Sequence, residues 1–210
     1  MALKTFVKIS GVTNLSDARY CAGMMVDMIG FDLDPDSEQF TAPDKFKEIT
    51  EWLSGVEMVG EFNDLDTDGI REAGEGYTLD AIQTSSVEAA PHIIKSTTLP
   101  VIFKLDVSDM DEPARMRPII EKVGMSAAFV LIESEGKEKG DQWVQEALEI
   151  AGNYPVVLGF GVTAENAEEL AASDLKGISL RGGEEIKPGL KDFDELADIL
   201  EALEIDDTVE

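Results

Sequence analysis

Short apolar runs rich in β-branched and aromatic residues recur along the chain and alternate with segments whose apolar positions repeat at helical spacing. Eight of these runs are predicted to be strands: Thr5–Ile9, Val26–Phe31, Val56–Phe62, Tyr77–Ile82, Pro100–Leu105, Ser126–Ile132, Pro155–Leu158 and Gly177–Leu180. Short buried strands that alternate with helices of about a dozen residues are typical of parallel βα units. Eight units favour a single closed (β/α)8 barrel, the TIM barrel, although the pattern alone leaves a doubly wound open sheet as the alternative.

The segments between the runs have helical spacing, and several carry helix start signals. The eight predicted helices are Asn14–Ala22, Pro43–Leu53, Thr67–Glu75, Ser86–Lys95, Asp111–Val123, Asp141–Ala151, Ala164–Ala172 and Asp192–Leu203. We therefore expect one barrel domain over residues 1–203, which suits a length of 210 residues and an apolar fraction of 43%. Residues 204–210 are acidic and lack an apolar face, so a frayed tail is expected there.

The stretch from Val7 to Ala18 has the pattern of a strand, a turn and a helix. Gly11 permits a sharp turn after the strand, and Asn14 with Asp17 three residues later resembles a capping box at the helix start. Proteins built from βα units hold their chemistry at the carboxyl ends of the strands. Ser10, at the end of the first predicted strand, is therefore the first candidate site residue.

Acidic residues dominate the charge of the chain, with 44 aspartates and glutamates against 17 lysines and arginines and a formal net charge of -27. Such a surface repels a polyanion, and there is no basic patch with interleaved aromatic residues, so no nucleic-acid partner is expected. The acidity fits either an ordinary solvated surface or adaptation to high intracellular salt, where repulsion between like charges is screened. Composition leaves both interpretations open.

No segment approaches the run of about 18 apolar residues that a transmembrane helix needs, and the first residues lack a signal-peptide pattern. We therefore expect a cytoplasmic protein without a membrane partner. The single cysteine, Cys21, cannot form an intramolecular disulfide and suits a packed helix position better than a reactive thiol. One cysteine, one histidine and scattered carboxylates show no metal-ligand spacing, so neither a metal nor another cofactor is expected.

Two glycine-containing loops are candidates for binding an anion. The first holds Gly159 and Gly161 before a predicted helix, and the second holds Arg181, Gly182 and Gly183 at the end of the last strand. Barrels frequently bind phosphate after their seventh and eighth strands. Glycine lets backbone N–H groups approach an anion, and arginine adds a charged fork. The loops predict binding of a phosphorylated small molecule, while tight turns are the simpler explanation of the glycines alone.

Further motifs occur in order and spacing over nearly the whole chain: Gly30-Phe31, Pro35-Asp36-Ser37, Asp80-Ala81-Ile82-Gln83, the stretch 158–166 (LGFGVTAEN) and the stretch 188–192 (PGLKD). Together with the opening Lys8-Ile9-Ser10-Gly11 they resemble the phosphoribosylanthranilate isomerase family of tryptophan biosynthesis. The resemblance implies a (β/α)8 barrel. It also implies an Amadori rearrangement, which requires a general acid and a general base.

The resemblance places the family's cysteine base at Ser10, its aspartate acid at Glu133 and its substrate-contacting arginine at Gln39. None of these three residue types is retained. A thiol, with an ordinary pKa of about 8.5, is partly ionised near neutrality, whereas a serine hydroxyl needs another group to take its proton. No such partner for Ser10 is evident in the sequence, and His92 lies in the fourth predicted helix, away from the strand ends.

Two functions remain open at this stage. The favoured one is a phosphate-ligand binder that kept the barrel and the anion loops but lost the cysteine and aspartate acid–base pair. The alternative is a working phosphoribosylanthranilate isomerase that uses altered residues. Either function is compatible with a monomer or a homodimer. Lys8, Lys104 and Asp106 interrupt apolar strands, and inward-facing charges need partners, so we expect a salt-bridge layer rather than a Schiff-base lysine.

Overall fold

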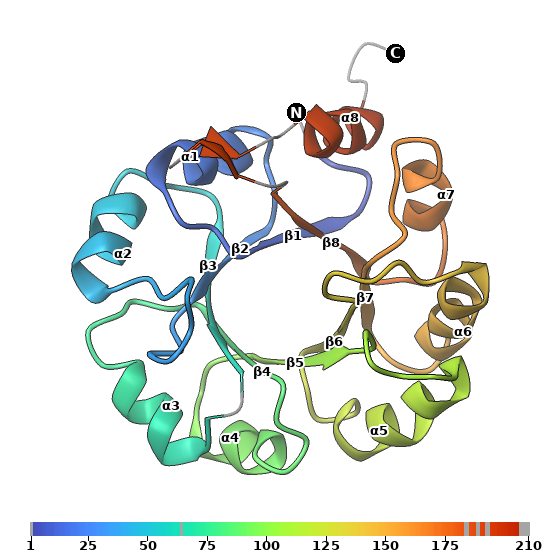
Figure 1. Cartoon of the computed structure of the whole chain (residues 1–210), viewed down its shortest axis with the longest axis horizontal. Helices are drawn as coiled ribbons and strands as arrows, with labels where there is room; N and C mark the ends of the chain where they lie inside the picture. Colours follow the sequence, from blue (N-terminus) through green and yellow to red (C-terminus); the bar gives the residue numbers. More distant parts are fainter. Residues whose placement is uncertain (1, 64, 183–184, 188–189, 192–193, 206–210) are drawn as a thin grey trace.

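Eight parallel strands close into a barrel in the computed structural model, and helices surround the barrel (Figure 1). The structure describes residues 2–63, 65–182, 185–187, 190–191 and 194–205. The strands are β1 (Phe6–Ser10), β2 (Met28–Asp32), β3 (Glu57–Phe62), β4 (Ala81–Thr84), β5 (Val101–Asp106), β6 (Phe129–Glu133), β7 (Val156–Gly159) and β8 (Gly177–Arg181). Each strand pairs with the next one along the chain, and β8 pairs with β1. The predicted (β/α)8 barrel is confirmed, and the open-sheet alternative is wrong.

The helices are α1 (Leu15–Gly23), α2 (Pro43–Thr50), α3 (Thr67–Ala73), α4 (Ala90–Ser96), α5 (Met116–Val123), α6 (Asp141–Ala151), α7 (Ala167–Ala171) and α8 (Asp194–Ala202), with a short 3₁₀ turn (Pro113–Arg115) before α5. The predicted start of α1 is confirmed, because Asn14 Oδ1 accepts a hydrogen bond of 3.0 Å from the Asp17 backbone N–H. Helix α4 begins four residues later than predicted. Pro91 lies in its first turn, where a proline needs no hydrogen bond.

Polar residues extend several strands beyond their predicted apolar ends. In β1, β6 and β8 the last residues are Ser10, Glu133 and Arg181, each one position further than the apolar pattern indicated. The parallel ladder uses backbone groups, so a polar side chain does not end it. Ser10 lies directly opposite Arg181 in the ladder between β1 and β8. A short antiparallel pair, β9 (Glu185–Lys187) and β10 (Leu190–Lys191), follows β8 and was not predicted.

The barrel interior divides into an apolar and a polar half. The apolar half lies toward the amino ends of the strands and contains Met28, Val59, Ala81, Ile102, Phe129, Leu131 and Val157, with Phe6 packed against them. The rings of Phe6 and Phe129 meet edge to face, with centroids 5.4 Å apart. The polar half lies toward the carboxyl ends, where the alternation of side chains places the buried Lys8, Glu61 and Lys104 inside the barrel. This asymmetry confines the candidate chemistry to one end of the barrel.

The two ends of the described chain meet. Leu3 forms an isolated antiparallel bridge with Glu204, and the Ile205 N–H donates to the Ala2 carbonyl at 2.9 Å. Residues 206–210 of the predicted tail lie outside the described residues, so the boundary at residue 203 stays a prediction. Cys21 is fully buried, as expected for a packed residue. No helix in the described part of the chain has the length and apolarity needed to span a bilayer.

Candidate functional site

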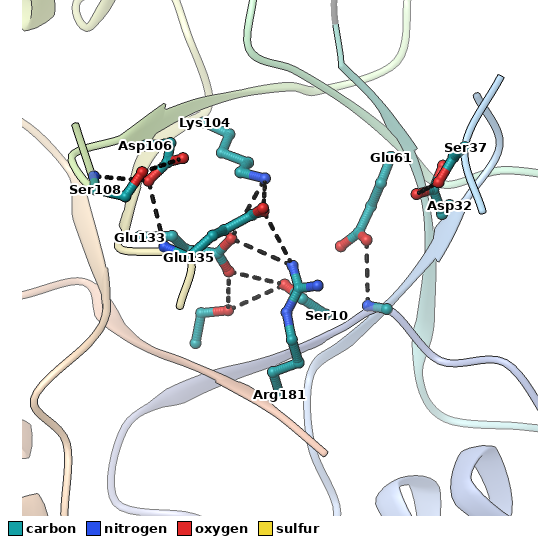
Figure 2. A network of polar contacts seen from close by, with 12 residues as sticks. Ser10, Asp32, Ser37, Glu61, Lys104, Asp106, Ser108, Glu133, Glu135 and Arg181 are labelled. Carbon is teal, nitrogen blue, oxygen red and sulfur yellow. Dashed lines mark hydrogen bonds and ion pairs between the residues drawn. The ribbon is translucent and has the colours of Figure 1, made fainter. Parts of the chain in front are cut away.

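The candidate residues gather at the carboxyl end of the barrel. Ser10 ends β1, Glu133 ends β6 and Arg181 ends β8, and Figure 2 shows all three side chains directed toward the barrel axis. Gly159 ends β7 beside Glu133, and the two are paired in the parallel ladder. Strands far apart in the sequence therefore bring together the residues that the sequence pattern and the family resemblance indicated.

Ser10 has partners that the sequence did not reveal. Its Oγ accepts a hydrogen bond of 2.7 Å from Lys8 Nζ and donates one of 3.1 Å to Glu133 Oε1. Ser179 Oγ on β8 lies 3.3 Å from the same hydroxyl. The expectation that Ser10 lacks a partner is therefore wrong. Lys8 is two residues away on the same strand and points to the same face, and Glu133 reaches across the barrel, which only the closed sheet makes possible.

Lys8 forms a buried ion pair with Glu61 of β3. Lys8 Nζ lies 2.5 Å from Glu61 Oε1, and the two side chains are 0% and 9% exposed. Burial alone would raise the pKa of Glu61, but Lys8, helped by Arg181 and Lys104, outweighs this, and the pKa is lower than its ordinary value. Gly30 on β2 makes the pair possible, because a Cβ there would lie 1.9 Å from Glu61 Oε1. The expected ion pair of Lys8 is thus confirmed.

A second ionic group links β5, β6 and β8. Lys104 Nζ lies 3.7 Å from Glu133 Oε2 and forms a close ion pair with Glu135, while Arg181 Nη2 lies 3.6 Å from Glu133 and 3.5 Å from Glu135 (Figure 2). Burial alone would lower the pKa of Lys104 and of Arg181. In both residues the surrounding glutamates, Glu133 first among them, outweigh burial and raise the pKa. The expected partner for Lys104 is therefore present.

Asp106 has a different role from the one expected. Its carboxylate accepts hydrogen bonds from the backbone and the side chain of Ser108, both at 2.9 Å, and from the Glu135 backbone N–H at 3.3 Å. These bonds shape the loops after β5 and β6, and no salt bridge of Asp106 occurs among the described residues. Asp106 therefore positions the backbone that carries Glu135.

The predicted anion loops lie beside this group. Gly159 leaves room for the neighbouring carboxylate, since a Cβ at that position would lie 2.6 Å from Glu133 Cγ, and Gly161 has a φ of 65°, which favours glycine. A cavity of about 200 Å³ reaches the first residue of each loop, Gly159 and Arg181, and is lined by Glu133, Ser134, Glu135, Gly136, Gly159, Leu180 and Arg181. The volume is sufficient for a phosphoryl group and part of the molecule attached to it.

Gln39 and Gly182 also lie near the mouth of the barrel, on the side of Gly11. A Cβ added to Gly11 would lie 3.4 Å from Gln39 Oε1 and 3.5 Å from Arg181 Nη1, so both side chains reach the turn after β1. Gly182 lines a narrow space together with Ser10 and Gly11. Gly183 lies outside the described residues, and its predicted role stays a prediction.

Glu61, Glu135 and Ser179 were missed in the sequence as site residues. Glu61 carries a signal similar to the one that singled out Lys8 and Lys104, a charge inside an apolar strand, although Glu57 lies on the same strand. Glu135 does not stand out in the sequence, because its approach to Lys104 and Arg181 depends on the loop that Asp106 holds. Nothing in the sequence distinguishes Ser179, a small hydroxyl in a buried strand.

Among the described residues, no group of three or more histidine, cysteine, aspartate or glutamate side chains is arranged to hold a metal ion. The carboxylates of the barrel mouth are instead matched with ammonium and guanidinium groups. His92 is exposed on α4, outside the barrel, as its predicted helical position indicated.

Comparisons with known proteins match one family over nearly the whole chain. The family model described as N-(5'phosphoribosyl)anthranilate (PRA) isomerase matches residues 7–202. The N-(5'-phosphoribosyl)anthranilate isomerase of Nitrosomonas eutropha is 28% identical over 195 residues, covering 91% of this chain and 92% of that protein. The crystal structure of phosphoribosyl anthranilate isomerase from Thermus thermophilus is 26% identical, with a TM-score of 0.74 and coverage of 95% of this chain and 98% of that one.

A further solved structure is similar in fold. It is a phosphoribosyl anthranilate isomerase in complex with reduced 1-(o-carboxyphenylamino)-1-deoxyribulose 5-phosphate, 23% identical, with a TM-score of 0.72 and coverage of 95% of this chain and 98% of that one. The barrel, the order of its motifs and the matched span of the family model all agree. The chain therefore belongs to the phosphoribosylanthranilate isomerase family.

Proposed function

We propose that this chain binds a phosphorylated small molecule at the carboxyl end of its barrel and has little or no phosphoribosylanthranilate isomerase activity. Binding is supported by the cavity of about 200 Å³, by Arg181 at its wall and by the glycines of the loop after β7. A relative of similar fold carries a 5-phosphate ligand in its crystal structure. Weak activity is expected because Ser10 and Glu133 replace the cysteine base and the aspartate acid that the family resemblance implies.

The main evidence for low isomerase activity is the hydrogen bond between Ser10 and Glu133. Lys8 donates its hydrogen bond to the Ser10 oxygen, so the nearest amine is a donor and not a proton acceptor. The Ser10 hydroxyl donates to Glu133, and a carboxylate is a far weaker base than the alkoxide that proton removal would leave. The hydroxyl is thus a link in an ionic network, with Glu133 as its hydrogen-bond acceptor.

The isomerase arm of the test is a fluorescence assay that follows loss of phosphoribosylanthranilate. We expect the parent to be nearly inactive, because general base catalysis typically contributes about 10² to 10⁴-fold. Ser10→Cys and Glu133→Asp together should raise turnover above the parent, and Gln39→Arg should then lower KM. The gains should be non-additive, because acid and base act on one reaction path. Parental turnover of about 1 to 10 per second, typical of enzymes, would overturn this part of the proposal.

The binding arm uses calorimetry with ribose 5-phosphate as the probe. Arg181→Ala should weaken binding by about tenfold or more, since a charge-assisted hydrogen bond contributes about 1.5–3 kcal/mol. Arg71→Ala is the matched control, because Arg71 is exposed on α3 and pairs with Asp68. No heat of binding for the parent, or equal affinities for the parent and Arg181→Ala, would contradict phosphate-ester binding at this site.

One observation favours the alternative of a working isomerase. Glu133 Oε1 lies 3.1 Å from Ser10 Oγ, so the hydroxyl does have a carboxylate that could receive its proton if a ligand displaced Lys8 from the oxygen. Under this alternative Ser10→Ala abolishes turnover of the parent, whereas under the proposal there is little turnover to lose. The parental assay therefore distinguishes the two functions.

A further inference from the structure

The charges around the candidate site restrict what the rest of its ligand can be. We propose that the phosphorylated ligand carries an amine near Glu133 and Glu135 and not a second anionic group such as a carboxylate. This inference rests on the proposed function, that is, on a phosphate ester binding at the carboxyl end of the barrel. The expected chemical class of that ester is an amino sugar phosphate or a similar phosphorylated amine.

The three cations that the described strands place at the barrel mouth each face a carboxylate. Within the described residues Lys8 pairs with Glu61, while Lys104 and Arg181 share Glu133 and Glu135. The charges of these three cations are thus balanced by three glutamates before a ligand binds. A phosphoryl group that engages Arg181 adds negative charge to this balanced group. A second anion on the ligand would find no free cation among these residues, and like charges brought together at a binding site cost affinity.

Glu133 also offers an acceptor that the protein leaves unused. The residue is 5% exposed, and its Oε2 accepts no hydrogen bond from the described part of the chain, although Lys104 and Arg181 lie within 4 Å. This atom belongs to a residue that lines the cavity of about 200 Å³. A buried carboxylate oxygen without a donor costs free energy, which a donor on the ligand would recover.

A second unmatched acceptor lies on β4. Gln83 is 3% exposed, and its Oε1 has no hydrogen-bond partner among the described residues. Gln83 lies opposite Glu61 in the parallel ladder of β3 and β4, so both side chains point into the barrel. The interior therefore presents acceptors from two strands. An ammonium group supplies three donors and a positive charge, which suits carboxylate acceptors better than a neutral hydroxyl does.

Three matched hexose phosphates test the inference: glucosamine 6-phosphate, glucose 6-phosphate and 6-phosphogluconate, which carry an amine, a neutral polyol and a carboxylate. Affinities are measured by calorimetry at pH 6.5, where amines are protonated, and at one fixed salt concentration. We expect glucosamine 6-phosphate to bind about tenfold tighter than glucose 6-phosphate, and 6-phosphogluconate about tenfold weaker than glucose 6-phosphate.

Variants connect the preference to the two glutamates. Glu135→Gln should reduce the ratio of the amine to the carboxylate affinity by about tenfold, and Glu133→Gln should reduce it further, because Glu133 is the more buried of the two. Glu138→Gln, an exposed position in the same loop, is the matched control and should leave the ratio unchanged. Arg181→Ala should weaken all three probes, since it removes the contact with the shared phosphate, and should weaken 6-phosphogluconate most, since it also removes a cation that faces Glu133 and Glu135.

The outcomes separate this inference from the proposed function. Binding of all three probes with equal affinity, or tightest binding of 6-phosphogluconate, overturns the amine preference and leaves phosphate-ester binding standing. A preference that survives in Glu135→Gln and Glu133→Gln also overturns it, because other groups would then select the amine. If none of the three probes binds, the proposed function and this inference fail together.

Discussion

Replacing Glu61 with glutamine removes the charge that neutralises the buried Lys8 and keeps the shape of the side chain. Lys8 is 0% exposed, and its other polar contact among the described residues is the neutral hydroxyl of Ser10. The variant therefore leaves an ammonium group inside the barrel without its counter-charge. Breaking a buried ion pair in this way costs about 3–5 kcal/mol, and we expect the lower end of that range because glutamine still offers an oxygen acceptor.

This cost can be read as a shift in the thermal midpoint. For a chain of 150–250 residues about 1 kcal/mol corresponds to about 2–4 °C, so a loss of about 3 kcal/mol predicts a Tm lower by about 6–12 °C. Circular dichroism or calorimetry measures the shift at pH 7. Glu57→Gln is the matched control, because Glu57 lies at the exposed start of the same strand and should change Tm by about 2 °C or less.

The pH dependence gives an independent check. The folded-state pKa of Glu61 is lower than its ordinary value of 4.5, so the unfolded chain takes up this proton more readily than the folded one. The stabilisation is therefore fully present above about pH 4.5 and is lost as the pH falls through the lower folded-state value. The Tm difference between the parent and Glu61→Gln should be constant near neutrality and should shrink below about pH 4.5.

A double variant distinguishes the ion pair from packing. Lys8→Met with Glu61→Leu replaces both charges with apolar groups and should recover most of the lost stability, since such replacements are often neutral or stabilising. A Tm for Glu61→Gln within about 2 °C of the parent would refute the reasoning. So would a double variant less stable than Glu61→Gln, because the pair would then contribute through its shape and not through its charge.

Two further predictions concern stability. Gly177→Ala should strongly destabilise the barrel, because its Cβ would lie 2.1 Å from the Phe6 carbonyl oxygen. Gly23→Ala, whose Cβ would have no neighbouring atom within 4 Å, should leave the stability unchanged or slightly higher. Thermal melts of the two variants check this, and equal Tm values would contradict it. Tm should rise with KCl concentration, because salt screens the repulsion within a chain whose formal net charge is -27. A flat or falling Tm would indicate an ordinary solvated surface without such repulsion.

The barrel could be predicted because the sequence contains two periodicities, that of buried strands and that of amphipathic helices. Apolar runs of strand length alternate with helical spacing eight times, and the family motifs follow in order. Boundaries were less accurate where backbone hydrogen bonds continue past the apolar residues, as at Ser10 and Arg181. The pair β9 and β10 has no apolar pattern of its own, so periodicity could not reveal it.

The contents of the site depended on contacts between distant strands. The sequence could mark Ser10 and Glu133 by resemblance, and it could mark Lys8 as a charge in need of a partner. Only the closed barrel decided that Glu61 is that partner, 53 residues away, and that Ser10 donates across the axis to Glu133, 123 residues away. Local pattern fixes which way a side chain points along its own strand, whereas closure of the sheet fixes which opposing side chain it meets.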